Sequence, residues 1–256
     1  MKNSDIKDLL DVKYLHFNNI GFIEKDPISI PHQFTTKTDI EIIGFLTATL
    51  AWGQRPVILS KANQLLGLMD HSPTEFIRGF KKADLKKFRN FKHRTFNEVD
   101  CIAFLMALQH IFMEFECLED AFCGKNNYEN LDLNVLISRF RTRFFQIEHE
   151  YRSEKHLSDP LTGSAVKRIN MFLRWMVRKD SYGVDFGIWN KIKMSQLMLP
   201  LDVHSGRVAR ALGLLKRRQD DWTAVKEVTM KLQKFDPEDP VKYDFALFGM
   251  GAENDF

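Results

Sequence analysis

Lys167 and Asp202 are the two residues whose type and position best suit covalent chemistry. Lys167 comes shortly after the turn-forming stretch 158–164, S-D-P-L-T-G-S, and Asp202 comes two residues after Pro200. A helix is expected to begin at each, because Pro and Gly end the preceding structure and Asp favours the N-cap. A neutral lysine amine can attack an electrophilic carbon, and a neighbouring carboxylate stabilises the cation that forms. If the fold brings these side chains together, they form a nucleophile paired with a carboxylate.

Hydrophobic spacing predicts the helices that would position these two residues. The stretch 199–215, L-P-L-D-V-H-S-G-R-V-A-R-A-L-G-L-L, gives a helix capped by Asp202 with apolar residues three or four apart. The helix after Lys167 has Arg174 and Arg178 on the face opposite its apolar stripe. A plain exposed basic face explains that pattern without function, whereas a facing anion or carboxylate would make it part of a site. Capping alone likewise explains Asp202.

Composition is typical of an ordinary globular protein. The 256 residues are 44% hydrophobic and 28% charged, and 37 basic against 34 acidic residues give a net charge of +3. This balance is too even to indicate a partner, so local clusters of charge matter more than the total. The 22 phenylalanines indicate helices that pack through aromatic anchors. The length suits one large domain or two modest ones.

The cysteines and the hydropathy pattern argue against several classes of protein. Cys101, Cys117 and Cys123 are too few and wrongly spaced for a four-thiolate zinc or iron–sulfur site. Their odd number, and the lack of a secretory leader, favour a cytoplasmic protein. No apolar run approaches the roughly 20 residues that a membrane span needs. We therefore expect no metal, no iron–sulfur cofactor and no membrane contact.

The chain is expected to be all-α, with about ten helices, because it has no convincing β-type alternation. Residues 40–51 are apolar almost all round and predict a central, buried helix. The helical pattern breaks between Lys179 and Pro200. We therefore expect two lobes: 39–198, ending in the Lys167 helix, and 1–38 plus 199–256, which carries the Asp202 helix.

A basic segment at 81–94, K-K-A-D-L-K-K-F-R-N-F-K-H-R, holds seven Lys or Arg residues against one Asp. The ordinary interpretation is a solvated helix face with aromatic anchors. The functional one is a patch that contacts phosphate, because basic clusters bind nucleic acid electrostatically. On that hypothesis Lys92 and Arg94 contact a DNA backbone.

The motifs around Lys167 and Asp202 resemble a known superfamily. Gly163–Asn170 (G-S-A-V-K-R-I-N), followed by Leu199–His204 (L-P-L-D-V-H), resembles the helix–hairpin–helix DNA glycosylases, most closely the archaeal type of 8-oxoguanine glycosylase. The chain also resembles an uncharacterised bacterial family through F-L-R-W-M-V-R at 172–178 and L-D-V-H-S-G-R at 201–207. The resemblance implies a two-lobed, all-α, glycosylase-like bundle.

The resemblance also implies roles for individual residues. Lys167 would attack the sugar C1′ of a damaged nucleotide, and Asp202 would stabilise the charge that develops there. The base pocket would consist of Gln54, Met171, Asp244 and Phe248. The contacts to DNA would come from Gly163, Ser164, His204, Arg207, Lys92, Arg94 and Arg174. No four-cysteine cluster follows the last helix, so no iron–sulfur cluster is expected.

The function that follows is base-excision repair of DNA. The chain is expected to be a glycosylase with AP lyase activity on an oxidised purine such as 8-oxoguanine in double-stranded DNA, acting by base flipping and a lysine Schiff base. It would work as a monomer without cofactor in the cytoplasm, associated with the nucleoid when on DNA. The alternatives are a non-catalytic protein that binds DNA structure or damage, and a helical protein-interaction module.

Overall fold

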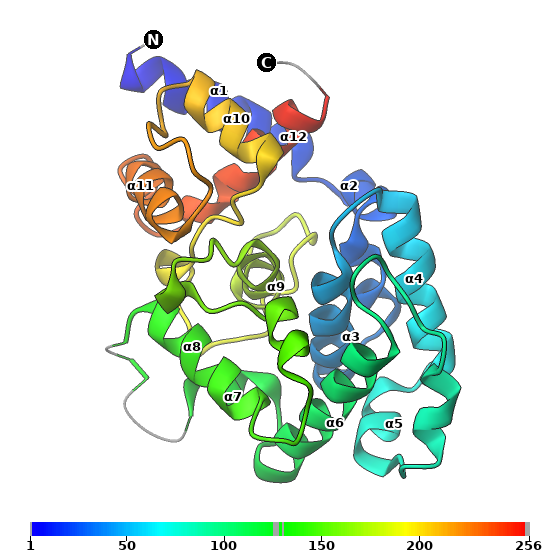
Figure 1. The fold of residues 1–256 in the computed structure, drawn as a ribbon. Helices are drawn as coiled ribbons and strands as arrows, with labels where there is room; N and C mark the ends of the chain where they lie inside the picture. The colour runs from blue at the N-terminus through cyan, green and yellow to red at the C-terminus, as the bar shows by residue number, and fades with distance from the viewer. Residues whose placement is uncertain (1, 125–127, 130, 254–256) are drawn as a thin grey trace. The chain divides into compact units, whose positions relative to one another are not determined.

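The computed structural model describes residues 2–124, 128–129 and 131–253 (Figure 1). The all-α prediction is confirmed: within these residues the regular elements are twelve α-helices and seven short 3₁₀-helices, and the only β-type pairings are isolated bridges. The number of α-helices slightly exceeds the expected ten.

The α-helices are α1 (Asn3–Phe17), α2 (Ile20–Lys25), α3 (Lys37–Leu50), α4 (Arg55–Leu68), α5 (Pro73–Gly79), α6 (Glu98–Glu114), α7 (Leu118–Cys123), α8 (Leu133–Phe144), α9 (Lys167–Val177), α10 (Val203–Ala211), α11 (Trp222–Leu232) and α12 (Tyr243–Ala252). The 3₁₀-helices are η1 (Pro27–Ser29), η2 (Pro31–Gln33), η3 (Asp84–Phe88), η4 (Tyr151–His156), η5 (Pro160–Thr162), η6 (Met194–Gln196) and η7 (Pro240–Lys242).

The chain divides into two compact units. Unit 1 comprises Met1–Glu24 and Pro160–Phe256, and unit 2 comprises Lys25–Asp159. The division expected from sequence, after residue 198, differs because it separates Lys167 from Asp202, whereas both lie in unit 1. The segment after α9 does not lead away to another lobe. It folds back on that helix, since Phe186 N donates to Trp175 O at 2.8 Å and Trp189 N donates to Met176 O at 2.9 Å.

Unit 2 is built around α3, whose residues from Ile40 to Leu50 are all buried. The predicted central helix is therefore present. Its Phe45 ring lies 5.7 Å from Phe140 and 5.3 Å from Phe144 between centroids, so aromatic side chains join α3 to α8. Such clusters bury large apolar areas and explain the high phenylalanine content.

Unit 1 carries the candidate site on α9, α10 and α12. Helix α12 packs against both α1 and α10 (Figure 1). Two glycines permit this close approach: a Cβ at Gly249 would overlap the Phe17 ring, and one at Gly251 would lie 2.7 Å from His204 O. The packing brings the residues of α12 to the start of α10, where Asp202 is the N-cap.

Candidate functional site

Lys167 is the first residue of α9, and its position is fixed by the preceding turn. Val166, the N-cap, has a left-handed backbone (φ 43°) and donates its N–H to Ser164 Oγ at 3.3 Å. The turn is tied to the start of α11, since Trp222 N donates to Gly163 O at 2.9 Å. Gly163 itself has φ +95°, a conformation that favours glycine. Gly163 and Ser164 therefore belong to the turn that positions Lys167 at the start of α9.

Asp202 is held by a reciprocal capping box at the start of α10. Its Oδ1 accepts hydrogen bonds from His204 N at 2.9 Å and Ser205 N at 3.0 Å, while Ser205 Oγ accepts from Asp202 N at 3.0 Å. The predicted N-cap is thus present, and it fixes the direction of the carboxylate. Because the cap uses Oδ1, the other oxygen remains for an ion pair.

Lys167 and Asp202 face each other. The distance from Lys167 Nζ to Asp202 Oδ2 is 3.7 Å, and the side chains are 26% and 21% exposed. Nζ also lies 3.5 Å from the sulfur of Met171, one turn further along α9. An amine, a carboxylate and a thioether therefore meet at a place that solvent still reaches. This is the arrangement on which the sequence-based hypothesis depended.

Arg174 requires a correction. It was expected to contact DNA, but it is only 4% exposed. Its guanidinium binds the carboxylates of Asp244 and Asp185 and lies 4.4 Å from the centroid of the Phe245 ring. The residues of α9 from Ile169 to Val177 are all buried, so the helix has no exposed basic face there. These two carboxylates bind the guanidinium of Arg174, where a contact to a DNA phosphate was expected.

Arg178 extends this buried ionic cluster. Its guanidinium lies 3.1 Å from Asp185 Oδ2, 3.0 Å from Asp239 Oδ2 and 2.7 Å from Asp180 Oδ2. Burial alone would lower the pKa of this guanidinium, but the carboxylates, Asp185 foremost, raise it above its usual value. Sequence reasoning named Asp244 but missed Asp180, Asp185 and Asp239, because no local spacing indicates that these carboxylates meet Arg178.

Asp244 is a further acidic member of this cluster, bound to Arg174. Burial raises the pKa of its carboxyl to about 6; the positive charge of Arg174 opposes this rise, the negative charge of Asp202 adds to it, and Lys167 opposes it. Its Oδ2 accepts a hydrogen bond from Arg174 Nη1. The expected role of Asp244, a hydrogen bond to a base, therefore competes with a partner already in place.

Three more expected site residues lie where α10 meets α12. His204 Nδ1 is 3.1 Å from Gly251 O, and Arg207 Nη2 donates to the same oxygen at 2.7 Å. The His204 ring meets the half-buried Phe248 edge to face, with centroids 5.9 Å apart. His204 and Arg207 are exposed and reachable by a ligand, although each also fastens α10 to α12.

Gln54, Lys92 and Arg94 belong to unit 2, whereas Lys167, Asp202 and the other expected site residues belong to unit 1. Gln54 is the exposed N-cap residue of α4 and makes no side-chain capping hydrogen bond. Lys92 and Arg94 are exposed in a turn after η3, and Arg94 has a left-handed φ of 54°. The basic segment 81–94 is therefore a short 3₁₀-helix and turns, not the face of a long helix.

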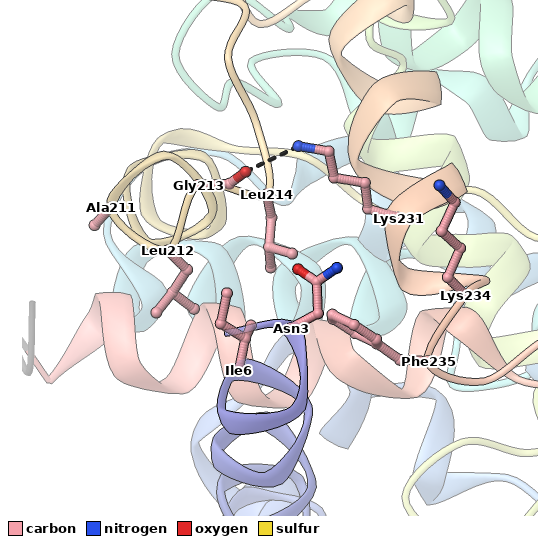
Figure 2. A pocket seen from close by; sticks show the side chains of 9 residues that line it. All are labelled: Asn3, Ile6, Ala211, Leu212, Gly213, Leu214, Lys231, Lys234 and Phe235. Atoms are coloured by element: carbon pink, nitrogen blue, oxygen red, sulfur yellow. Dashed lines mark hydrogen bonds between the residues drawn. The ribbon is translucent and has the colours of Figure 1, made fainter. Parts of the chain in front are cut away.

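A separate pocket of about 420 Å³ lies in unit 1 between the ends of α1, α10 and α11 (Figure 2). Its apolar residues include Ile6, Leu212 and Phe235. Lys231 Nζ donates a hydrogen bond to Gly213 O at 2.8 Å. Gly213 follows the end of α10, where backbone carbonyls have no hydrogen-bond donor within the helix. The pocket includes neither Lys167 nor Asp202.

In the part of the chain that the structure describes, no three His, Cys, Asp or Glu side chains converge as a metal-binding group. Cys101 and Cys123 are buried, and burial raises the pKa of the Cys117 thiol to about 11. No described helix is both long and apolar enough to cross a membrane.

Comparison with known proteins identifies the family. A family model described as "Protein of unknown function (DUF2400)" matches residues 26–253, so the chain belongs to this family. No curated protein and no solved structure matches. The assignment to the helix–hairpin–helix glycosylase superfamily is therefore wrong, because the matching model is that of an uncharacterised family. Short motifs around Lys167 and Asp202 had carried that assignment, and spacing alone does not establish a family.

Proposed function

We propose that this member of the DUF2400 family is a DNA glycosylase with AP lyase activity that acts on an oxidised purine such as 8-oxoguanine. The observation that carries the proposal is the half-buried pair of Lys167 and Asp202, with 3.7 Å between Nζ and Oδ2. A lysine beside a carboxylate is suited to attack a carbon that becomes positively charged as its leaving group departs. The C1′ atom of a nucleotide is such a carbon.

The steps balance with these two side chains and water. The neutral amine of Lys167 forms a bond to C1′ while the bond from C1′ to the base breaks, and the departing base takes up a proton. The nitrogen loses a proton, and the C1′–O4′ bond then breaks as O4′ takes up a proton from water, which leaves a protonated Schiff base at C1′ and a hydroxyl at C4′. Water then takes a C2′ proton, a C1′=C2′ enamine forms, and the C3′–O bond breaks so that the 3′ phosphate leaves by β-elimination. Asp202 stabilises the cationic stages by its charge.

The surroundings of the pair suit a flipped nucleotide. Met171 and Phe248 offer a thioether and an aromatic ring beside the amine and the start of α10. Stacking on such side chains holds extruded bases in other proteins. The exposed His204 and Arg207 supply groups for phosphate. We expect the protein to act as a monomer on nucleoid DNA in the cytoplasm, without metal or cofactor.

The test is release of 8-oxoguanine from a labelled duplex, followed by strand cleavage without added alkali. Wild type should do both, and Lys167→Ala should lower the rate at least 100-fold because the nucleophile is lost. Lys226→Ala is the matched control, since Lys226 is an exposed lysine on α11. Undamaged duplex is the substrate control. Equal rates for wild type and Lys167→Ala would refute the proposal.

A second candidate function, binding of DNA structure or damage without catalysis, is favoured by one observation. The capping hydrogen bonds of Asp202 give this residue a structural purpose that needs no chemistry. Phosphate contacts would then supply most of the affinity. Damage-selective, salt-sensitive binding that Lys167→Ala and Asp202→Asn leave unchanged, without base release, would support this alternative.

A further inference from the structure

Segment 81–94 of unit 2 presents all of its Lys and Arg side chains to solvent. Its large apolar residues are buried, since Leu85, Phe88 and Phe91 are 7%, 0% and 1% exposed. The seven exposed cations are Lys81, Lys82, Lys86, Lys87, Arg89, Lys92 and Arg94. The proposed function makes no use of this segment, although its charge is the most concentrated of the sequence motifs considered above.

The backbone of the segment is held in place by packing and by hydrogen bonds. The Phe88 ring lies 5.4 Å from the Phe76 ring of α5 between centroids. His93 N donates to Phe96 O at 2.8 Å, and Phe96 N donates to His93 O at 2.9 Å. A basic surface on a fixed backbone loses less conformational entropy on binding than a disordered tail of the same charge.

The positive charges of the segment are mostly not neutralised by the protein itself. Among the residues that the structure describes, Lys87 alone of the seven cations forms an ion pair, with Asp70 at 2.7 Å. The one acidic residue of the segment, Asp84, accepts a hydrogen bond from Lys81 N through Oδ2 at 2.8 Å. The segment has seven of the 37 basic residues and one of the 34 acidic residues, which leaves 30 basic and 33 acidic residues elsewhere. All of the positive net charge therefore arises here, and like charges so close together repel one another unless a polyanion binds.

Arg94 and a lysine of α4 widen the charged area. The backbone of Arg94 has a left-handed φ of 54°, a conformation that costs energy in a residue other than glycine. Its guanidinium lies against the turn before α4, since a Cβ at Gly53 would be 2.9 Å from Arg94 Nη1. Lys61 of α4 has its Nζ 5.9 Å from the centroid of the Phe91 ring. We call the seven cations of 81–94 together with Lys61 the basic surface.

The chemistry of the basic surface favours a duplex over other polyanions. Proteins that bind at a lipid surface insert apolar or aromatic side chains, and proteins that bind single strands stack the bases on aromatic rings. In segment 81–94 the large apolar side chains are buried instead. Duplex DNA carries one negative charge per about 1.7 Å of its axis, and its phosphates are bound by Lys and Arg without apolar contacts.

We propose that the basic surface of unit 2 binds the phosphate backbone of duplex DNA, independently of base sequence and of damage. It is a DNA contact in addition to the proposed site of Lys167 and Asp202 in unit 1. The inference rests on the proposed function for the choice of DNA, but neither the contacts nor the test involves the reaction. Each cation that meets a phosphate displaces a counterion from the DNA, so the affinity falls as the salt concentration rises.

The experiment measures binding of the full chain to a fluorescently labelled, undamaged duplex of about 20 base pairs by anisotropy, between about 50 and 200 mM NaCl. The logarithm of the association constant should fall linearly with the logarithm of the salt concentration. A triple variant, Lys86→Gln with Arg89→Gln and Lys92→Gln, should reduce the magnitude of this slope by about 3, because three phosphate contacts are lost. At the lowest salt concentration its affinity should be at least about 30-fold weaker than that of wild type.

A matched control removes the same amount of charge from another part of the chain. Lys216→Gln with Lys226→Gln and Lys234→Gln changes three exposed lysines of unit 1 and should keep the wild-type slope. Circular dichroism checks that both triple variants are folded. If the first triple variant does not fold, Lys92→Gln alone changes one exposed side chain and should reduce the magnitude of the slope by about 1.

Three results would overturn the inference: equal slopes for the two triple variants, tighter binding to a single strand of the same length than to the duplex, or binding to phosphatidylserine vesicles without binding to the duplex. Because the duplex is undamaged, the measurement is independent of base excision. Salt-dependent binding through the basic surface without release of 8-oxoguanine refutes only the proposed function. Release of 8-oxoguanine with equal slopes for the two triple variants refutes only this inference.

Discussion

Asp202 performs two tasks with its two oxygens. Oδ1 caps α10, and Oδ2 faces the Lys167 amine. A cap needs only a hydrogen-bond acceptor, whereas the ion pair needs negative charge. The two tasks can therefore be separated by substitution.

Asp202→Asn and Asp202→Ala should differ in stability. The amide oxygen of Asn still accepts from His204 N and Ser205 N, so this variant should unfold within about 0.5 kcal/mol of wild type. Alanine removes the cap and should cost about 1 kcal/mol. Urea denaturation measures both. Equal losses in the two variants would mean that charge, and not capping, is what stabilises the fold here.

Asp244 should give the protein a distinctive dependence of stability on pH. Its pKa is raised in the folded state to about 6, so its contribution is present below the unfolded value of 3.8 and is lost as pH rises through 6. The free energy of unfolding of wild type relative to Asp244→Asn should thus fall on the order of 3 kcal/mol between pH 4 and 7. Denaturation of both proteins across this range checks the sign. A difference that rises with pH would contradict the shift.

At the scale of elements, the site depends on the close packing of α10 against α12. A Cβ at Gly251 would lie 2.7 Å from His204 O and 2.9 Å from His204 Cβ, so neither helix can stay in place if Gly251 is replaced. Two parts of the site belong to this contact: Phe248, which meets the His204 ring, and the Gly251 carbonyl, which binds His204 and Arg207.

Gly251→Ala should therefore destabilise the protein by about 1–3 kcal/mol through overpacking. Gly79→Ala is a fair control, because Gly79 ends α5 with nothing within 4 Å of an added Cβ. This control should be neutral or slightly stabilising. Thermal unfolding compares the two. If Gly251→Ala were as stable as Gly79→Ala, the described packing of α12 would be wrong.

The helices themselves were easier to predict than the contacts that their side chains make with other parts of the chain. The buried helix at 40–51 and the capped helix after Asp202 follow from local periodicity and capping, which depend on near neighbours in the chain. The burial of Arg174 does not follow from local periodicity, because one of its carboxylate partners is 11 residues away in the sequence and the other is 70 residues away. A basic residue opposite an apolar stripe looks exposed until its distant partners are known. The sequence spacing likewise does not show that Lys167 approaches Asp202, so the sequence analysis could state this pair only as a condition.

At the scale of the whole molecule, mild acid should change the stability of the two units in opposite directions, because each unit contains a different kind of buried ionisable group. In unit 2 the His93 side chain is 1% exposed, and its Nε2 lies 3.1 Å from Trp52 O. Burial lowers the pKa of His93 below its usual 6.5. The stability it contributes is present above 6.5 and is lost as pH falls toward the lowered value.

Acid should therefore weaken unit 2 around His93, whereas protonation of Asp244 favours unit 1. Hydrogen exchange followed by mass spectrometry at pH 5 and 7, corrected for intrinsic rates, resolves the units separately. Protection near His93 should fall at pH 5 in wild type and change less in His93→Gln. Equal losses in wild type and variant would contradict the assignment to His93.

The central claim is that the Lys167 amine becomes covalently bonded to DNA. Borohydride reduces a protonated Schiff base to a stable amine, so it traps the proposed intermediate on a duplex that contains 8-oxoguanine. The account predicts one adduct that peptide mapping assigns to Lys167, that Lys167→Ala abolishes and that Lys226→Ala retains. The absence of an adduct with wild type, or an equal yield with Lys167→Ala, would contradict it.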